Sequence, residues 1–148
     1  MAVTTSIYNA FKYDILTKAT SWTADTINCA LFSASTFTAA DTAYTTSGTE
    51  VASANGYTTG GAAVSTRTVT GTTTQVCKIT GAGGTGSAGT VAWTTTGAGF
   101  SAVAAKLYST TNSNRPIAHI DFGGTQTASG GGNFTIIWDA TNGVFNLS

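Results

Sequence analysis

A chain of 148 residues, of which only 8% are charged, fits one domain (residues 1–148) that can bury roughly 70% of its unfolded surface. Its six basic and six acidic side chains cancel and are scattered along the chain, which excludes the cation cluster that direct nucleic-acid binding requires. No stretch reaches the roughly 18 apolar residues of a membrane span, and the first residues lack the features of a signal peptide. We therefore expect a protein made in a reducing cytoplasm, with no membrane segment.

The low charge also predicts association. Ordinary soluble proteins carry about 25% charged residues, whereas Thr, Ala, Gly and Ser take that place here. Three Trp, seven Phe and five Tyr residues argue against disorder. Because such a surface lacks the usual electrostatic protection against association, we expect it to be partly covered in an oligomer.

Residues 6–19 carry the pattern of an amphipathic helix, within an N-terminal helix and arm at residues 1–20. Ile7, Phe11 and Ile15 recur at four-residue spacing and form one apolar stripe. A Thr or Ser at positions 4–6 can cap the start of the helix. The stripe predicts that the helix packs on a sheet or docks on a neighbouring subunit.

After this helix, alternating apolar residues predict strands. Ile27, Cys29 and Leu31 share one face of the first strand. Thr38 and Asp41 resemble a capping box, so a short helical turn is expected over residues 38–44. The gaps between strands carry Gly, Thr, Ser and Asn, which favours an antiparallel β-sandwich, jelly-roll-like, with one N-terminal α-helix. The expected strands are residues 27–32, 63–69, 75–80, 90–94, 103–109, 117–122, 134–139 and 144–147.

Residues 50–61 are predicted to form a loop between the first strand and the later strands. Glu50 is the only glutamate in the sequence, and we expect it to be a local hydrogen-bond acceptor that ties the loop down. Asn55-Gly56 and Gly60-Gly61 supply backbone angles that other residues adopt only at a cost. The loop is therefore interpreted as structural.

Residues 81–86, Gly-Ala-Gly-Gly-Thr-Gly, match the dinucleotide-binding fingerprint in form. That fingerprint requires a helix after its last glycine and an acidic residue about twenty positions further on. Another predicted strand follows instead, and the acidic residue is missing. We therefore expect a hairpin loop and no bound cofactor.

His119 shares a predicted strand face with Asp121, so an imidazole oriented beside a hydroxyl nucleophile is conceivable. Serine and threonine are so abundant in this chain that one of their hydroxyls will lie near the histidine by chance. A histidine bonded to Asp121 or facing solvent is therefore the favoured alternative. Asp121 and Asp139 are candidates for paired glycosidase carboxylates, but no spacing supports that role. A single histidine with scattered aspartates has no metal-ligand spacing. We expect no catalytic, cofactor-binding or metal-binding residue, and no enzyme.

The two cysteines, Cys29 and Cys77, both lie in apolar, alternating segments. In a cytoplasmic chain such thiols behave as small buried hydrophobes more often than as a disulfide. We therefore expect two free thiols.

The order of several motifs resembles a known family. These motifs are an N-terminal helix with Tyr8 and Phe11, Trp22 to Leu31, Glu50-Val51, residues 56–61, residues 91–93, residues 120–123 and residues 132–139. In this order and spacing the chain resembles small structural proteins of tailed bacteriophages, similar to capsid decoration (cement) proteins. The resemblance implies a β-sandwich that binds the outside of the mature head, often as a trimer, and it implies no catalytic residues.

On this resemblance we expect a cement protein that bridges capsid subunits, with the major capsid protein as its partner. It would reside at the capsid surface of the virion, and in the host cytoplasm during assembly. One alternative is a tail, baseplate or fibre-associated virion protein. Another is a carbohydrate-binding module in which Trp22, Tyr57 or Trp93 stacks on a sugar. The residues expected at the capsid interface lie on the helix and in the 50–61 loop: Phe11, Glu50, Tyr57, Gly60 and Gly61.

Overall fold

The structure is a computed structural model that describes residues 3–71, 77–86, 89–139 and 143–147. The chain is mainly β, with 53% of its residues in strands and one short helix. Each expected strand overlaps an observed one. Residues 75–76, which were expected to begin a strand, lie outside the described residues. Strands β1 and β3 were not expected. The elements are β1 (Thr4–Ile7), α1 (Asn9–Leu16), β2 (Ile27–Ser35), β3 (Gly48–Glu50), β4 (Ala62–Gly71), β5 (Cys77–Gly84), β6 (Thr90–Thr94), β7 (Phe100–Ser109), β8 (Arg115–Ala128), β9 (Asn133–Ile137) and β10 (Phe145–Leu147).

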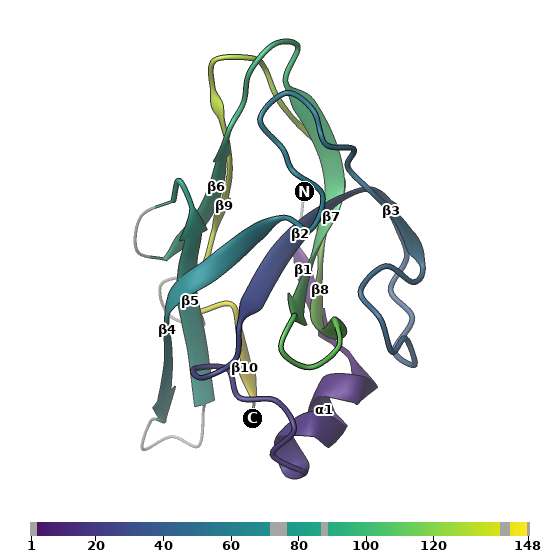
Figure 1. The fold of residues 1–148 in the computed structure, drawn as a ribbon, viewed down its shortest axis with the longest axis vertical. Coiled ribbons are helices and arrows are strands. Elements are labelled where there is room, and N and C mark those ends of the chain that lie inside the picture. The colour runs from purple at the N-terminus through teal and green to yellow at the C-terminus, as the bar shows by residue number, and fades with distance from the viewer. Residues whose placement is uncertain (1–2, 72–76, 87–88, 140–142, 148) are drawn as a thin grey trace.

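The strands form one curled sheet in the order β1-β8-β7-β2-β4-β5-β6-β9, with β10 beside β5 and β3 beside β2. Strand β4 joins two halves of this sheet, since Ala62 and Ala63 pair with β2 whereas Val64 to Gly71 pair with β5. Figure 1 shows the resulting half-barrel, with β4, β5, β6 and β9 on one side and β1, β2, β7 and β8 on the other. The mainly-β prediction with one helix is confirmed, but a sandwich or jelly-roll is not.

One strand pair differs from the antiparallel expectation. Residues 81–86 do not form a hairpin loop, because β5 continues through Gly84. Gly83 and Gly84 pair in parallel with Val91 and Ala92 of β6. A hairpin joins antiparallel strands, so that prediction is wrong. At Gly84, where φ is 60°, a Cβ would lie 2.0 Å from the Ala92 carbonyl oxygen, and this close approach requires glycine.

Side chains of β2 alternate between two cores. Ile27, Cys29 and Leu31 belong to a large cluster that both halves of the sheet share, which confirms their common face. Ala30 and Phe32 belong to a second cluster on the opposite face, which the segment 36–47 covers. Cys29 is a free, buried thiol whose pKa is raised by burial, as expected; the side chain of Cys77 lies outside the described part of the chain.

The N-terminal region begins as a strand rather than a helix. Thr4–Ile7 pairs antiparallel with β8, so the Thr and Ser side chains at positions 4–6 do not cap α1. The N-cap is Tyr8, without a side-chain hydrogen bond. The predicted helix at 6–19 is therefore shorter, because pairing with the sheet satisfies the backbone of its first residues.

Helix α1 packs on the sheet through the predicted apolar stripe, since Phe11 is buried in the main core and Ile15 packs against it. Asp14, which falls off the stripe, is buried as well. Its Oδ2 accepts hydrogen bonds from Arg115 Nε at 2.7 Å and from Asn112 Nδ2 at 3.1 Å. These bonds hold the helix to the turn between β7 and β8.

Residues 38–44 form turns instead of the predicted helical turn. The Asp41 N–H donates to the Thr38 carbonyl oxygen at 3.0 Å, which closes a single turn. Asp41 Oδ1 accepts a hydrogen bond from Ser47 Oγ at 3.1 Å. The carboxylate thus connects two parts of the segment that covers the sheet.

Candidate functional site

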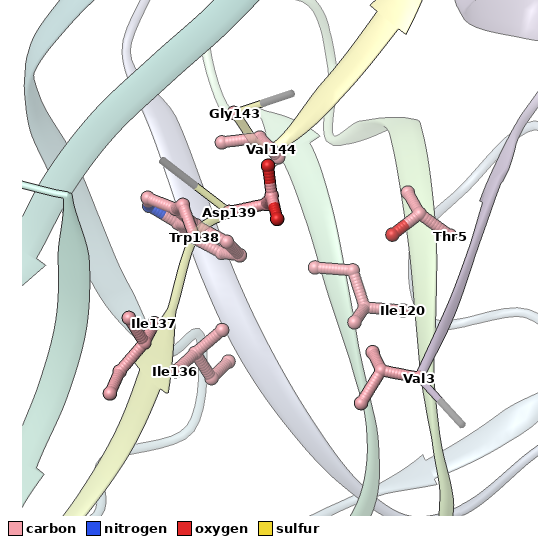
Figure 2. A pocket seen from close by; sticks show the side chains of 9 residues that line it. All are labelled: Val3, Thr5, Ile120, Ile136, Ile137, Trp138, Asp139, Gly143 and Val144. Carbon is pink, nitrogen blue, oxygen red and sulfur yellow. The ribbon is translucent and has the colours of Figure 1, made fainter. Parts of the chain in front are cut away.

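The strands that end the sheet order, β1 and β9, flank a cavity of about 310 Å³. Thr5 and Ile120 lie opposite each other in the β1–β8 register and form one wall. Figure 2 shows β9 and the residues after it on the other side. The cavity therefore lies where the half-barrel does not close. It is lined by Val3, Thr5, Ile120, Ile136, Ile137, Trp138, Asp139, Gly143 and Val144.

The cavity combines apolar walls with one carboxylate. Val3 and Ile137 are 62% and 75% exposed, so the cavity is bordered by apolar surface that solvent can reach. Asp139 is also exposed, and Figure 2 shows its carboxylate between Trp138 and Thr5. Apolar walls favour a hydrocarbon group, and a carboxylate favours a cation or a hydrogen-bond donor. The site can therefore hold a ligand that has both a hydrocarbon part and a cationic or hydrogen-bond-donating part.

Both flanking strands leave one edge without a strand partner. Within the described residues, β1 pairs with β8 alone and β9 with β6 alone. Such an edge presents a row of N–H and C=O groups that can pair with another strand. Beyond β9, Trp138 N–H donates to the Gly89 carbonyl oxygen at 2.9 Å, and Asp139 forms a bridge with Gly143. The chain next to this edge is thus fixed in position.

Sequence reasoning missed this site. It placed Asp139 at the end of a strand, but alternation does not reveal which strand is an edge. The adjacent pair Ile136 and Ile137 was the available signal, because strict alternation would have made one of them polar. Asp121, considered as a partner carboxylate, does not line the cavity. Its Oδ1 accepts a hydrogen bond from the Gly123 N–H at 2.8 Å.

The 50–61 loop is held by the Glu50 cluster, which consists of Glu50, Tyr44, Tyr57 and Gly60. Glu50 Oε1 accepts hydrogen bonds from the Tyr57 hydroxyl and the Gly60 N–H, both at 2.6 Å. Oε2 accepts one from the Tyr44 hydroxyl at 3.2 Å. Because the acceptor is ionised, these bonds are stronger than neutral ones. The expectation that Glu50 is a local acceptor is confirmed.

Tyr57 links this cluster to the sheet. The Leu31 N–H of β2 donates to the Tyr57 hydroxyl oxygen at 2.9 Å. Burial, followed by the hydrogen bond to Glu50, raises the pKa of Tyr57. The phenol therefore stays protonated and keeps its proton for the carboxylate.

Of the five residues expected at a capsid interface, two are buried in the subunit and three, Glu50, Gly60 and Gly61, are half-buried. Phe11 and Tyr57 are 1% and 3% exposed, and Glu50 and Gly60 bond to each other. Gly61 has a φ of 71°, and a Cβ there would lie 1.9 Å from a carbonyl oxygen of β2. Gly61 thus approaches another backbone segment closely, and that segment is β2 of the same chain. Phe11 and Tyr57 belong to the main core of the isolated chain, and the interface role of all five residues stays a prediction.

A second buried polar group, the Lys106 layer, consists of Lys106, His119, Ser35 and Asp41. The Lys106 ammonium donates to the Thr46 carbonyl oxygen and lies 4.6 Å from the centre of the Phe32 ring. Burial lowers the pKa of Lys106, and the charge of Asp41 opposes this shift. Asp41 Oδ2 is buried without a hydrogen-bond partner among the described residues. The layer thus contains charges that are only partly compensated.

His119 neither bonds to Asp121 nor faces solvent, so that expectation is wrong. It is buried, and its Nε2 lies 3.0 Å from Ser35 Oγ. Burial, followed by the charge of Lys106, lowers the pKa of His119. An imidazole beside a hydroxyl does exist, but neither residue lines the cavity between β1 and β9.

The other candidate sites also differ from expectation or carry no ligand set. Trp22, Tyr57 and Trp93, considered as a sugar-stacking platform, are all buried, so they form no exposed platform. Among the described residues, no three His, Cys, Asp or Glu side chains gather closely enough to hold a metal ion. In the same part of the chain, no helix has the length and hydropathy to cross a membrane.

Comparisons with known proteins give no relative. No protein-family model, curated protein or solved structure matches this chain. Function is therefore inferred from the exposed side chains, the cavity and the order of the sequence motifs.

Proposed function

We propose that the protein is a structural component of a tailed-bacteriophage virion: a capsid decoration (cement) protein that binds the outer head surface and bridges capsid subunits. The resemblance of the motif order to that of small phage structural proteins supports this role. Contacts repeated over a capsid lattice gain avidity, so that each one can be modest. A neutral, hydroxyl-rich surface suits hydrogen-bonded contacts that depend little on salt. The proposed role involves no catalysis and no cofactor.

The observation that carries the proposal is the exposure of large apolar side chains at two separate places. Tyr13 and Leu16 on α1 are 64% and 85% exposed, and their three-residue spacing makes them neighbours on the helix surface. Val3 and Ile137 are exposed at the cavity. Helix α1 lies at one end of the half-barrel (Figure 1). Neighbouring apolar groups on a weakly charged surface favour contact with other proteins, and two such places allow one molecule to bridge two subunits.

Co-sedimentation with purified phage heads tests the proposal. The protein is expected to bind expanded, mature heads and to ignore unexpanded ones, because expansion creates the junctions between capsomers. Leu16→Ser should weaken this binding, whereas Val69→Ser, at an exposed apolar position of β4, should not. Imaging of particles with labelled protein gives its location. Label confined to the tail would reject the cement role and favour a tail, baseplate or fibre-associated protein.

The proposal includes self-association, with a trimer as the expected form. Within each subunit of this trimer, the two halves of the curled sheet would act as the two layers of the β-sandwich that the resemblance implies. Light scattering over the micromolar range measures the molar mass. A monomer at all of these concentrations would contradict the trimer.

A further inference from the structure

We propose that protonation of His119 opens the segment 36–47, so that acid uncovers the second core while the rest of the fold stays closed. This segment contains no helix or strand, and it lies over the cluster that includes Ala30, Phe32 and Tyr108. The opening involves contacts within one subunit only, so it does not depend on the capsid role. It would give the protein an apolar surface that is exposed in acid and covered at neutral pH.

Two basic side chains lie next to each other beneath this segment. Lys106 of β7 and His119 of β8 are direct partners in the antiparallel register, so both side chains point to the same face of the sheet. Lys106 is 0% exposed and His119 is 3% exposed, and buried charges are screened little by salt and water. While the imidazole is neutral, the pair carries one positive charge. Protonation of His119 would place a second buried positive charge directly opposite the first, which destabilises a strand pair.

The two bases also hold the two ends of the segment. At its start, Ser35 Oγ lies 3.0 Å from His119 Nε2, and the Phe37 ring packs against the imidazole with 5.9 Å between the ring centres. At its end, the Lys106 ammonium donates to the Thr46 carbonyl oxygen. Repulsion between the bases therefore acts on both attachments. Outward movement of the segment lets water reach both charges.

The other groups around His119 do not balance a second positive charge. The charged and titratable groups there are Lys106 on β7, Asp41 in the segment, Asp121 on β8, and Tyr8, which follows β1 and packs on the Phe37 ring. The Asp41 carboxylate acts on both bases, but one carboxylate cannot neutralise two cations. Asp121 is exposed, so water screens its charge. Burial raises the pKa of Tyr8, and its phenol stays neutral.

Opening is thus linked to proton uptake. In the closed state the pKa of His119 is lowered by burial and by the charge of Lys106, whereas a solvated imidazole in the open state titrates near about 6.5. Below that pH the open state binds more protons, so acid favours it. One proton changes the opening equilibrium by at most about tenfold per pH unit, which gives a rise of up to about 25-fold between pH 7 and pH 5.

Amide hydrogen exchange of the full chain, followed by NMR at pH 7 and pH 5 and corrected for intrinsic rates, tests the opening. Two bonds join the segment to its surroundings: the Asn9 N–H donates to the Ala39 carbonyl oxygen at 3.0 Å, and the Tyr44 N–H donates to the Asn114 carbonyl oxygen at 3.1 Å. Protection of both amides should fall about 10- to 25-fold in acid. The Thr95 N–H, which is bonded in the other half of the sheet, should keep its protection. Equal loss at all three amides, or no loss at Asn9 and Tyr44, would overturn the proposal.

Two variants show whether His119 is the group that takes up the proton. His119→Gln cannot titrate, so its Asn9 and Tyr44 amides should have the same protection at pH 7 and pH 5. The matched control Asp121→Asn changes another titratable residue of β8 and should keep the acid response. His119 is the only histidine of the chain, so its imidazole signal also reports the titration without a variant. An imidazole that titrates at or above about 6.5 in the folded protein, or an acid response that persists in His119→Gln, would overturn the proposal.

Discussion

The Glu50 cluster and the Lys106 layer are two solutions to the same structural problem, which is to hold a long loop over the sheet with polar side chains. In the Glu50 cluster, both carboxylate oxygens have donors, three in total. In the Lys106 layer, the ammonium has the Thr46 carbonyl and an aromatic ring, while Asp41 Oδ2 has no partner among the described residues. Both groups contact the segment 36–47, the Glu50 cluster through Tyr44 and the Lys106 layer through Thr46. They differ in how fully their charges are compensated.

This difference has an energetic meaning. A buried polar group contributes to stability only when its hydrogen bonds are made, and an unmade bond costs the desolvation of the group. We therefore expect the Glu50 cluster to stabilise the fold, and we expect the charges of the Lys106 layer to be replaceable if both are removed together. Four predictions test this comparison.

The largest effect is expected for Tyr57→Ala. It removes a buried ring from the main core, a bond to Glu50 and the acceptor of the Leu31 N–H. The free energy of unfolding should fall by about 3–5 kcal/mol, measured by urea denaturation. Tyr57→Phe, which keeps the ring, separates the contribution of the hydroxyl. A loss below about 1 kcal/mol for the alanine variant would show that the ring does not hold the core, and would favour its predicted interface role.

Lys106→Met should lower stability by about 3 kcal/mol, because it leaves the buried Asp41 carboxylate without a nearby cation. Adding Asp41→Asn to this variant should recover at least half of the loss, since the remaining buried charge is then also removed. Urea denaturation of the two single variants and the double variant measures this coupling. Strictly additive losses would mean that the two charges do not interact, and that the Lys106 layer resembles the Glu50 cluster more than we infer.

Glu50→Gln should cost about 2 kcal/mol, because the amide keeps the shape of the side chain but loses the charge and turns one acceptor into a donor. The matched control is Asp121→Asn, where an exposed carboxylate accepts one bond from the Gly123 N–H. Its loss should stay within about 0.5 kcal/mol. Thermal unfolding of both variants gives the comparison, and equal shifts would contradict the special role of the cluster.

The smallest effect concerns pH. The pKa of His119 is lowered in the folded state, so between that value and the unfolded value of about 6.5 the unfolded chain binds more protons. Stability should therefore rise with pH through this window and be fully present above it. The groups that act on His119 are the charges of Lys106, Asp41 and Asp121, together with the Ser35 hydroxyl. His119→Gln should flatten the curve of stability against pH; an unchanged curve would show that His119 does not titrate there.

The sequence predicted much of the local structure, because local structure follows local patterns. Alternation identified eight strands, and the face shared by Ile27, Cys29 and Leu31 is the one in the main core. The Asn-Gly and Gly-Gly pairs of the 50–61 loop have the positive φ values that their residue types indicate. Two errors lie where strand pairing overrides propensity: at Thr4–Ile7, which joins β8, and at Gly84, which joins β6 in parallel.

By itself, the sequence determined that this chain is mainly β, has one N-terminal helix, and uses its single glutamate as a local acceptor. Side-chain period and turn chemistry are properties of neighbouring residues, so they can be read along the chain. Only the tertiary structure decided which strands lie at the edges of the sheet, that the half-barrel stays open between β1 and β9, and that Asp139 reaches the cavity there while Tyr57 is buried. These features depend on contacts between residues far apart in sequence, such as Thr5 with Ile120, and no local pattern specifies which distant strand a segment will pair with.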